Sequence, residues 1–175
     1  MGQGYLCANI DKKEYLYSSG SYKLTEHSWI GNDFVESVEA LLAKEWKNNR
    51  IVWAGQYMEN MLFLPDGEVE DTNLYYYADK HYMELKPSEG NPTYRFIVNN
   101  TLKQFIDKNR IRDNNGWQVH PFPIITSSGN GQGGGDYHPI NEQDAAFLGL
   151  WTGHRIYATN EARDTYEEII PDFYP

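Results

Sequence analysis

The stretch that decides the fold is SWIGNDFVESVEALLAKEW, residues 28–46. Asn32 or Asp33 can cap a helix here, and Glu36 lies in its first turn, where a carboxylate is favourable. Apolar residues then recur at steps of three and four positions, the spacing that places them on one face of a helix. They are Phe34, Val35, Val38, Leu41, Leu42 and Trp46. The stretch therefore predicts an amphipathic helix over residues 33–46 whose apolar face is buried.

Two predicted β-hairpins lie on either side of this helix in the sequence. The first has apolar runs at residues 5–10 and 15–17 around a polar turn at 11–13. The second covers residues 93–108, with its turn near 99–102. Further elements are expected outside them: strands at 50–55, 117–128 and 154–159, a second helix within 71–86 capped by Asp71 or Thr72, and a short helical turn within 144–151.

This pattern indicates an α+β fold, with a mostly antiparallel sheet built from hairpins and one or two helices packed on a face. The 175 residues fit one domain, for which we expect residues 1–160. The segment 161–175 is acidic, and we expect it to run over the surface.

A weak internal repeat relates residues 5–57 to residues 95–155. CANIDKKEYLY can be aligned with IVNNTLKQFID, which matches Asn9 to Asn99, Lys13 to Lys103 and Glu14 to Gln104. Further on, WAGQ at 53–56 is similar to WTGH at 151–154. Either the chain contains a duplication, or two hairpins share the same short sequence pattern.

The charge balance narrows the range of partners. The chain has 25 acidic and 15 basic residues, a net charge of −10. Nucleic acid is therefore not the default partner, because binding to phosphates needs a basic face. A basic protein partner is compatible with this charge, and so is a purely solubilising role.

The cysteine content and the length of the apolar runs indicate the cellular compartment. Cys7 cannot form an internal disulfide, so a disulfide-stapled secreted scaffold is excluded. No signal peptide is visible, and no apolar run approaches the roughly 18 residues that span a bilayer. We expect a cytoplasmic protein without a membrane partner.

The most unusual segment is SSGNGQGGGDYHP, residues 127–139. Successive backbone N–H groups of such glycines can form an anion-binding nest, although neither a P-loop nor a dinucleotide fingerprint is present. We expect this loop and two residues beyond it to bind an anionic ligand, or to be an ordinary turn. The candidate residues are Gly129, Gly131, Gly133, Gly134, Gly135, Asp136, Tyr137, His138, Trp151 and Arg155.

Histidines and aromatic rings offer further candidates. His120, His138 and His154 could serve a hydrolase, but their spacing matches no metal or catalytic motif, so no catalytic residue, metal or cofactor is assigned. Aromatic residues make up 15% of the chain, and rings with polar edges often line pockets and interfaces. Trp29, Trp53, Trp117 and Trp151 each lie beside a glycine or a turn.

Several of these segments together resemble a family of small bacterial and phage-borne proteins. They are DKKEYL, WIGNDFVESVEALLAKEW, RIVWAGQY, YRFIVNNTLKQFID, WQVHPFPIITSSGNGQGGGDY and LWTGH. The resemblance implies a single domain and suggests a setting of phage–host conflict. It brings no established activity and no catalytic residue.

We expect one of two function classes, and a third class is the least favoured alternative. The first is a non-catalytic protein that sequesters a small nucleotide-like anion through the glycine-rich loop and an aromatic pocket. The second is an acidic inhibitor or immunity-type protein that covers a basic partner. The third is a hydrolase that uses His120, His138 or His154.

Overall fold

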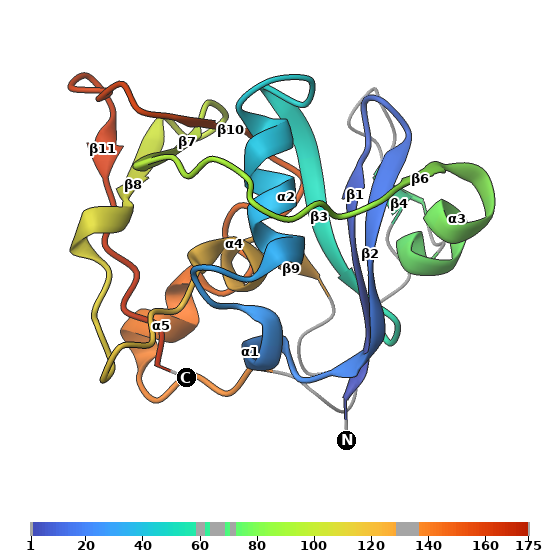
Figure 1. Ribbon diagram of the computed structural model, residues 1–175, viewed down its shortest axis with the longest axis horizontal. Coiled ribbons are helices and arrows are strands. Elements are labelled where there is room, and N and C mark those ends of the chain that lie inside the picture. Colours follow the sequence, from blue (N-terminus) through green and yellow to red (C-terminus); the bar gives the residue numbers. More distant parts are fainter. Residues whose placement is uncertain (1, 59–61, 64–68, 71–72, 129–136, 175) are drawn as a thin grey trace.

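The computed structural model describes residues 2–58, 62–63, 69–70, 73–128 and 137–174 (Figure 1). Its strands are β1 (Gln3–Asn9), β2 (Glu14–Tyr22), β3 (Asn49–Gly55), β4 (Leu62–Phe63), β5 (Val69–Glu70), β6 (Met83–Leu85), β7 (Phe96–Asn99), β8 (Gln104–Asp107), β9 (Ser127–Ser128), β10 (Arg155–Thr159) and β11 (Glu167–Glu168). Its helices are α1 (Leu24–His27), α2 (Asp33–Leu42), α3 (Leu74–His81), α4 (Pro121–Ile125) and α5 (Glu142–Phe147), with a 3₁₀ turn η1 (Lys108–Arg110).

Nine of the described strands form one mostly antiparallel sheet, which confirms the predicted α+β fold. Its order is β11-β8-β7-β10-β3-β1-β2-β6, and β9 pairs with β3 beside this path. Strands β4 and β5 pair only with each other. Both predicted hairpins, β1–β2 and β7–β8, are present.

Helix α2 forms as predicted. The Asn32 side chain caps it by accepting a hydrogen bond from Val35 N at 3.1 Å. Val38 and Leu42 are fully buried, whereas Leu41 is only half-buried. The helix ends at Leu42, one turn before the predicted end, and Trp46 is buried in the turn that follows. None of the helices within the described ranges is long and apolar enough to cross a membrane.

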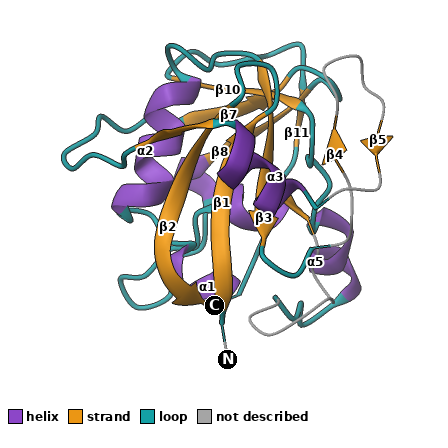
Figure 2. Cartoon of the chain, turned by 90° about the vertical axis from the view of Figure 1, so that its right-hand side faces the viewer, coloured by secondary structure: helices purple, strands orange, loops and turns teal. Residues whose placement is uncertain are grey.

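The two long helices cover opposite faces of the sheet (Figures 1 and 2). Successive residues of a strand point to opposite faces, so one strand can contribute to two cores. In β1, Cys7 packs in the core that contains Val38 of α2, while Leu6 and Ala8 pack with Leu74 of α3. The sheet is therefore buried on both sides.

The sheet repeats the same arrangement on either side of the junction between β3 and β10. Each half has a hairpin, a third strand on the first strand of the hairpin, and a parallel edge strand on the second. The registers agree as well: Asn9 pairs with Glu14 and Ile51, and Asn99 pairs with Gln104 and Ile156. The structural repeat thus covers CANIDKKEYLY and IVNNTLKQFID, the two hairpin segments that the sequence alignment matched.

In each half, a tryptophan side chain is hydrogen-bonded to the first residue of the hairpin's second strand. Trp46 Nε1 donates to Glu14 Oε1 at 2.9 Å, and Trp151 Nε1 donates to Gln104 Oε1 at 3.0 Å. These contacts match Trp151 to Trp46, and not to Trp53 as the sequence alignment had it. The gapless pair WKNNRI (46–51) and WTGHRI (151–156) carries this match.

Two predicted elements differ from the structure. Helix α3 begins at Leu74 with Asn73 as its cap, and residues 83–85 of the predicted helix form strand β6 instead. The predicted strand at 117–128 is wrong for most of its length, because residues 121–125 form helix α4 and only Ser127–Ser128 form a strand, β9. The His120 side chain caps α4, and a proline in the first turn fits a helix start because its missing N–H has no partner to lose there.

The C-terminal segment is part of the fold. The expectation that it runs over the surface is wrong for two of its side chains, because Ile169 and Phe173 are buried. Strand β11 pairs in parallel with β8 and extends the sheet. The segment therefore supplies core residues to the second half.

Candidate functional site

The glycine-rich segment lies mostly outside the described residues. Gly129, Gly131, Gly133, Gly134, Gly135 and Asp136 all fall within 129–136. The prediction that this segment binds an anionic ligand stays a prediction.

The four other residues predicted for that site have separate surroundings. The Tyr137 ring is buried against Phe173, and its hydroxyl accepts from Tyr174 N at 3.1 Å. His138 is exposed. Trp151 is fully buried, so its ring faces the core and not solvent. Arg155 is exposed and forms an ion pair with Asp11 at 3.3 Å.

The three histidines considered for hydrolysis also have different partners. His154 Nδ1 is hydrogen-bonded to Asn99 Nδ2 at 3.0 Å. His120 is fully buried and contacts Glu39, and His138 is exposed. The structure gives these three rings no shared hydrogen-bond partner within the described part of the chain.

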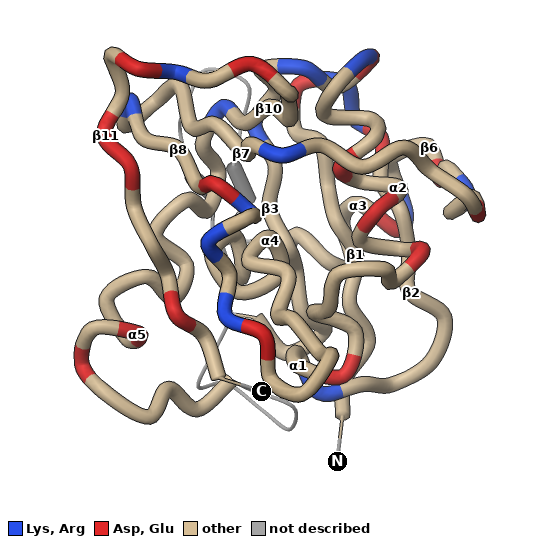
Figure 3. Tube along the Cα trace, turned by 60° about the vertical axis from the view of Figure 1, so that its left-hand side comes forward, with Lys and Arg blue, Asp and Glu red and all other residues tan. Residues whose placement is uncertain are grey.

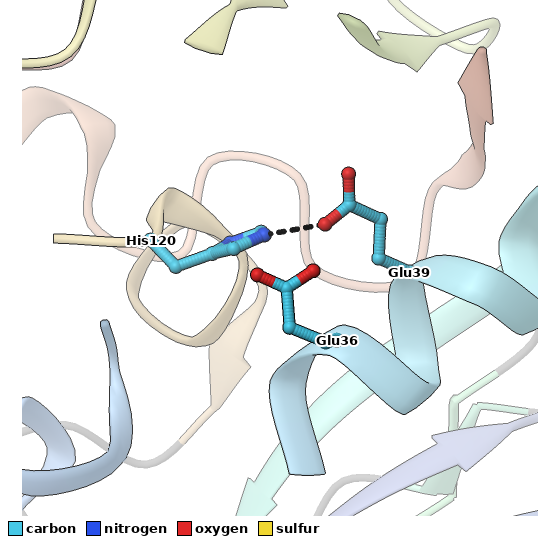
Figure 4. Close-up of side chains that lie close together, drawn as sticks. All are labelled: Glu36, Glu39 and His120. Carbon is cyan, nitrogen blue, oxygen red and sulfur yellow. Dashed lines mark hydrogen bonds and ion pairs between the residues drawn. The ribbon is translucent and has the colours of Figure 1, made fainter. Parts of the chain in front are cut away.

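The described residues include a buried cluster of four titratable side chains, Glu36, Glu39, His120 and Lys108, of which Figure 4 draws the first three. Glu36 and Glu39 lie three residues apart on α2, so both point from one face of the helix. Glu39 Oε1 pairs with Lys108 Nζ at 2.6 Å, and Glu39 Oε2 contacts His120 Nε2 at 3.0 Å. Burial opposes ionisation of Glu39, but the hydrogen bonds from His120 and Lys108 outweigh it and lower its pKa to about 2.

Two carboxylates and an imidazole can bind a divalent metal, and one ligand atom from each of Glu36, Glu39 and His120 lies within 4.8 Å of the others. The hydrogen bond at the other ring nitrogen of His120, Nδ1, does not fit a metal-binding histidine. His120 Nδ1 accepts a hydrogen bond from Phe122 N at 3.2 Å, so in the neutral ring Nε2 must carry the hydrogen. A metal-binding Nε2 would have no hydrogen, and its Nδ1–H would instead donate to an acceptor. The Lys108 ammonium also forms an ion pair with Glu39. We therefore interpret the cluster as an ion-pair network that joins α2, η1 and α4.

A pocket of about 350 Å³ lies beside the start of α2, between the end of β2, helix α1 and the segment 28–32. We call it the aromatic pocket. Five rings contribute to its lining: Tyr17, Tyr22, His27, Trp29 and Phe34. Tyr17, Tyr22 and Trp29 are half-buried, whereas His27 and Phe34 are buried, so the first three rings offer the more accessible aromatic surface.

The charged side chains that line the aromatic pocket are acidic. They are Glu26, whose carboxylate accepts from Lys23 N at 2.8 Å, and Asp33, in the first turn of α2. No lysine or arginine is among the residues that line it in the described structure. Both carboxylates belong to exposed residues, so they are available to a ligand.

His27 does not add a positive charge to the lining of the aromatic pocket. Its ring is buried among Tyr5, Tyr22, Phe34 and Trp53. Trp53 Nε1 donates to His27 Nε2 at 3.0 Å, so Nε2 carries no hydrogen. Burial lowers the pKa of His27 from its ordinary 6.5 to about 4, which keeps the ring neutral at physiological pH. The aromatic pocket therefore combines rings and negative charge.

Sequence reasoning missed most of this pocket. It singled out Trp29 only as a ring next to a turn, and it assigned Phe34 to the core of the helix. The available signal was the density of rings and acids within residues 17–34, a stretch that precedes and begins α2. The spacing of Glu36 and Glu39 likewise indicated that the two carboxylates share a helix face.

Comparisons with protein families, with curated proteins and with solved structures find no match to this chain. The resemblance to a bacterial and phage-borne family stays a prediction. The function must therefore be argued from the residues of the chain itself.

Proposed function

We propose that this chain is a non-catalytic, acidic binding protein that covers a basic protein partner and takes a cationic side chain of that partner into the aromatic pocket. The observation that carries the proposal is the lining of this pocket, where five rings and two carboxylates meet without a lysine or arginine. Of the two function classes expected from the sequence, this is the acidic protein-binding one.

The chemistry of the lining favours a cation. An ammonium or guanidinium group is attracted to the face of an aromatic ring by about 0.5–2 kcal/mol, and more strongly when the contact excludes water. Glu26 and Asp33 add Coulombic attraction at the rim. A volume of about 350 Å³ accommodates a lysine or arginine side chain, and falls within the usual range for ligand sites.

The charge of the whole chain supports the same partner. Acidic residues exceed basic ones by ten, and several of the basic side chains are already in ion pairs, including Arg50, Arg95, Arg110 and Arg112. Figure 3 shows acidic positions spread over the chain. Such a surface repels anions at long range and accelerates encounter with a basic protein.

The buried cluster does not argue for catalysis. Its carboxylates and imidazole are buried, Glu39 is bonded to both His120 and Lys108, and Glu39 is fully inaccessible. A general base must reach the proton that it abstracts, and these atoms are enclosed by protein.

The test is calorimetric titration with a lysine-rich peptide, an arginine-rich peptide and a glutamine-substituted peptide of equal length. Glu26→Gln combined with Asp33→Asn removes both charges from the pocket at nearly constant shape. The matched control is Glu142→Gln combined with Glu161→Gln, which removes two exposed charges outside the pocket lining.

We expect the pocket double variant to bind the basic peptides at least about tenfold more weakly, which corresponds to about 1.4 kcal/mol. The control should change affinity by less than about threefold, since only long-range charge is lost. Equal weakening in the two double variants would reduce the effect to net charge and overturn the pocket as the binding site.

A further inference from the structure

One oxygen of the buried cluster lacks a partner. Glu36 is 5% exposed, and its Oε1 accepts from Gly31 N at 2.9 Å. Its Oε2 is buried and has no hydrogen-bond partner. Figure 4 shows the Glu36 carboxyl group pointing toward His120 and Glu39. A buried carboxylate oxygen without a donor is costly, so something must satisfy it.

The surrounding charges identify a proton as that partner. The groups that face Glu36 are Glu39 on the same helix, Lys108 on η1 and His120 before α4. The His120 hydrogen is already donated to Glu39, and the Lys108 ammonium is paired with Glu39. If Glu36 were ionised, two carboxylates would share a single ammonium in a buried site. If Glu36 is protonated, the cluster is neutral and its O–H can donate to Glu39.

We propose that Glu36 is held as a neutral carboxylic acid whose O–H is donated to Glu39, and that a cation entering the aromatic pocket releases this proton. The second half of the proposal rests on the function proposed above. In the coupled step, the Glu36 O–H bond breaks, the proton goes to solvent, and the carboxylate that remains faces an added positive charge. No oxidant, reductant or covalent intermediate is involved.

The connection between the two sites is short. Gly31 donates its N–H to Glu36 Oε1, and it also lines the aromatic pocket. Asn32, Asp33 and Phe34, which follow it in the chain, line the same pocket. A cation in the pocket favours the ionised form of a nearby carboxyl group, and by linkage the ionised form favours the cation. Burial and the neighbouring Glu39 carboxylate raise the pKa of Glu36, which agrees with a retained proton.

Glu36→Gln is the informative variant. The glutamine amide has nearly the shape of a protonated glutamate: its oxygen can accept from Gly31 N, and its NH₂ can donate to Glu39. We therefore expect it to fold with unchanged stability at neutral pH. Glu142→Gln, at an exposed position, is the control for the loss of one carboxyl group.

Infrared difference spectroscopy tests the proton without any ligand. We expect the stretch of a protonated carboxyl group at neutral pH in the parent and in Glu142→Gln, and its absence in Glu36→Gln. A parent spectrum without this band would overturn the proposal.

Calorimetry of the lysine-rich peptide in buffers of different ionisation enthalpy tests the release. We expect up to about one proton released per complex in the parent and in Glu142→Gln, and none in Glu36→Gln. Binding without Glu36-dependent release would overturn the coupling and leave the proposed function standing. Absence of binding would overturn the proposed function together with the coupling, while the infrared band would still decide the state of Glu36.

Discussion

Acidification charges the histidines of the unfolded chain before it charges His27 of the folded protein. The His27 ring is 2% exposed and stacks at 5.9 Å on Trp53, whose indole N–H occupies its Nε2. Burial lowers the pKa of His27 from 6.5 to about 4. Between these two values the unfolded state binds a proton that the folded state does not bind.

The sign and size of the effect follow from this difference. Stability due to neutral His27 is fully present above pH 6.5 and is lost progressively as the pH falls toward 4. Each tenfold change in proton affinity corresponds to about 1.4 kcal/mol, so the interval from 6.5 to about 4 corresponds to about 3 kcal/mol. This is a large part of the 5–15 kcal/mol, roughly, that stabilises a typical domain.

The assay is urea denaturation of the parent and of His27→Gln at several pH values, with His138→Gln as the control at an exposed position. The parent should be more stable than His27→Gln near neutral pH, and this difference should shrink by about 3 kcal/mol on acidification. The His138→Gln variant should differ from the parent by no more than about 0.5 kcal/mol, as is usual for a substitution at an exposed position.

A difference between parent and His27→Gln that does not change with pH would refute the reasoning. If His27→Gln does not fold, NMR titration of the parent decides the matter instead. A His27 ring that takes up its proton near pH 6.5 would show that burial does not hold it neutral.

Three further predictions address the core, the partner and the glycine-rich loop. Leu42→Ala should lower the free energy of unfolding by about 2–5 kcal/mol, since the side chain is fully buried under α2, and an unchanged denaturation midpoint would contradict that packing. Association with a basic partner should weaken steeply with added salt, mainly through the association rate measured by stopped flow, and a salt-independent rate would count against electrostatic recognition. Replacing residues 133–135 with alanine, with the fold checked by melting, should abolish any binding of cyclic or linear nucleotides that calorimetry detects in the parent, and equal binding or no binding by both proteins would make the loop purely structural.

The elements that depend on local sequence could be predicted. The cap at Asn32 and the apolar spacing that follows it are read from neighbouring residues, and α2 forms where they indicate. The turns at Lys13 and Lys103 connect runs of alternating residues, and both hairpins form. The error at α4 was also local, because Ile124 and Ile125 favour strands while a proline after a capping side chain favours a helix start.

The candidate sites depend on contacts between distant residues, and these could not be read from the sequence. Glu36 and Glu39 share a helix face by spacing alone, but their burial depends on Lys108 and His120, which lie far along the chain. The aromatic pocket needs Pro87 beside the residues of β2, α1 and α2. A single sequence indicates which residues lie on one face of a helix or strand. It does not indicate which distant segment packs against that face.

The junction between the two repeated halves has a consequence for how the chain folds. Strands β3 and β10 pair through only two residue pairs, Arg155 with Arg50 and Ile156 with Asn49. Each hairpin closes over a turn of a few residues, whereas this junction joins positions separated by about 100 residues, which costs more chain entropy. Asp11 accepts hydrogen bonds from both Arg50 and Arg155, and so connects the halves at this position. We therefore expect the hairpins to form early and independently and the junction to close later. The amide hydrogens of Asn48 and Ile51, which donate across the junction to Ile156 O at 2.9 Å and His154 O at 3.3 Å, should become protected from exchange later than those inside either hairpin.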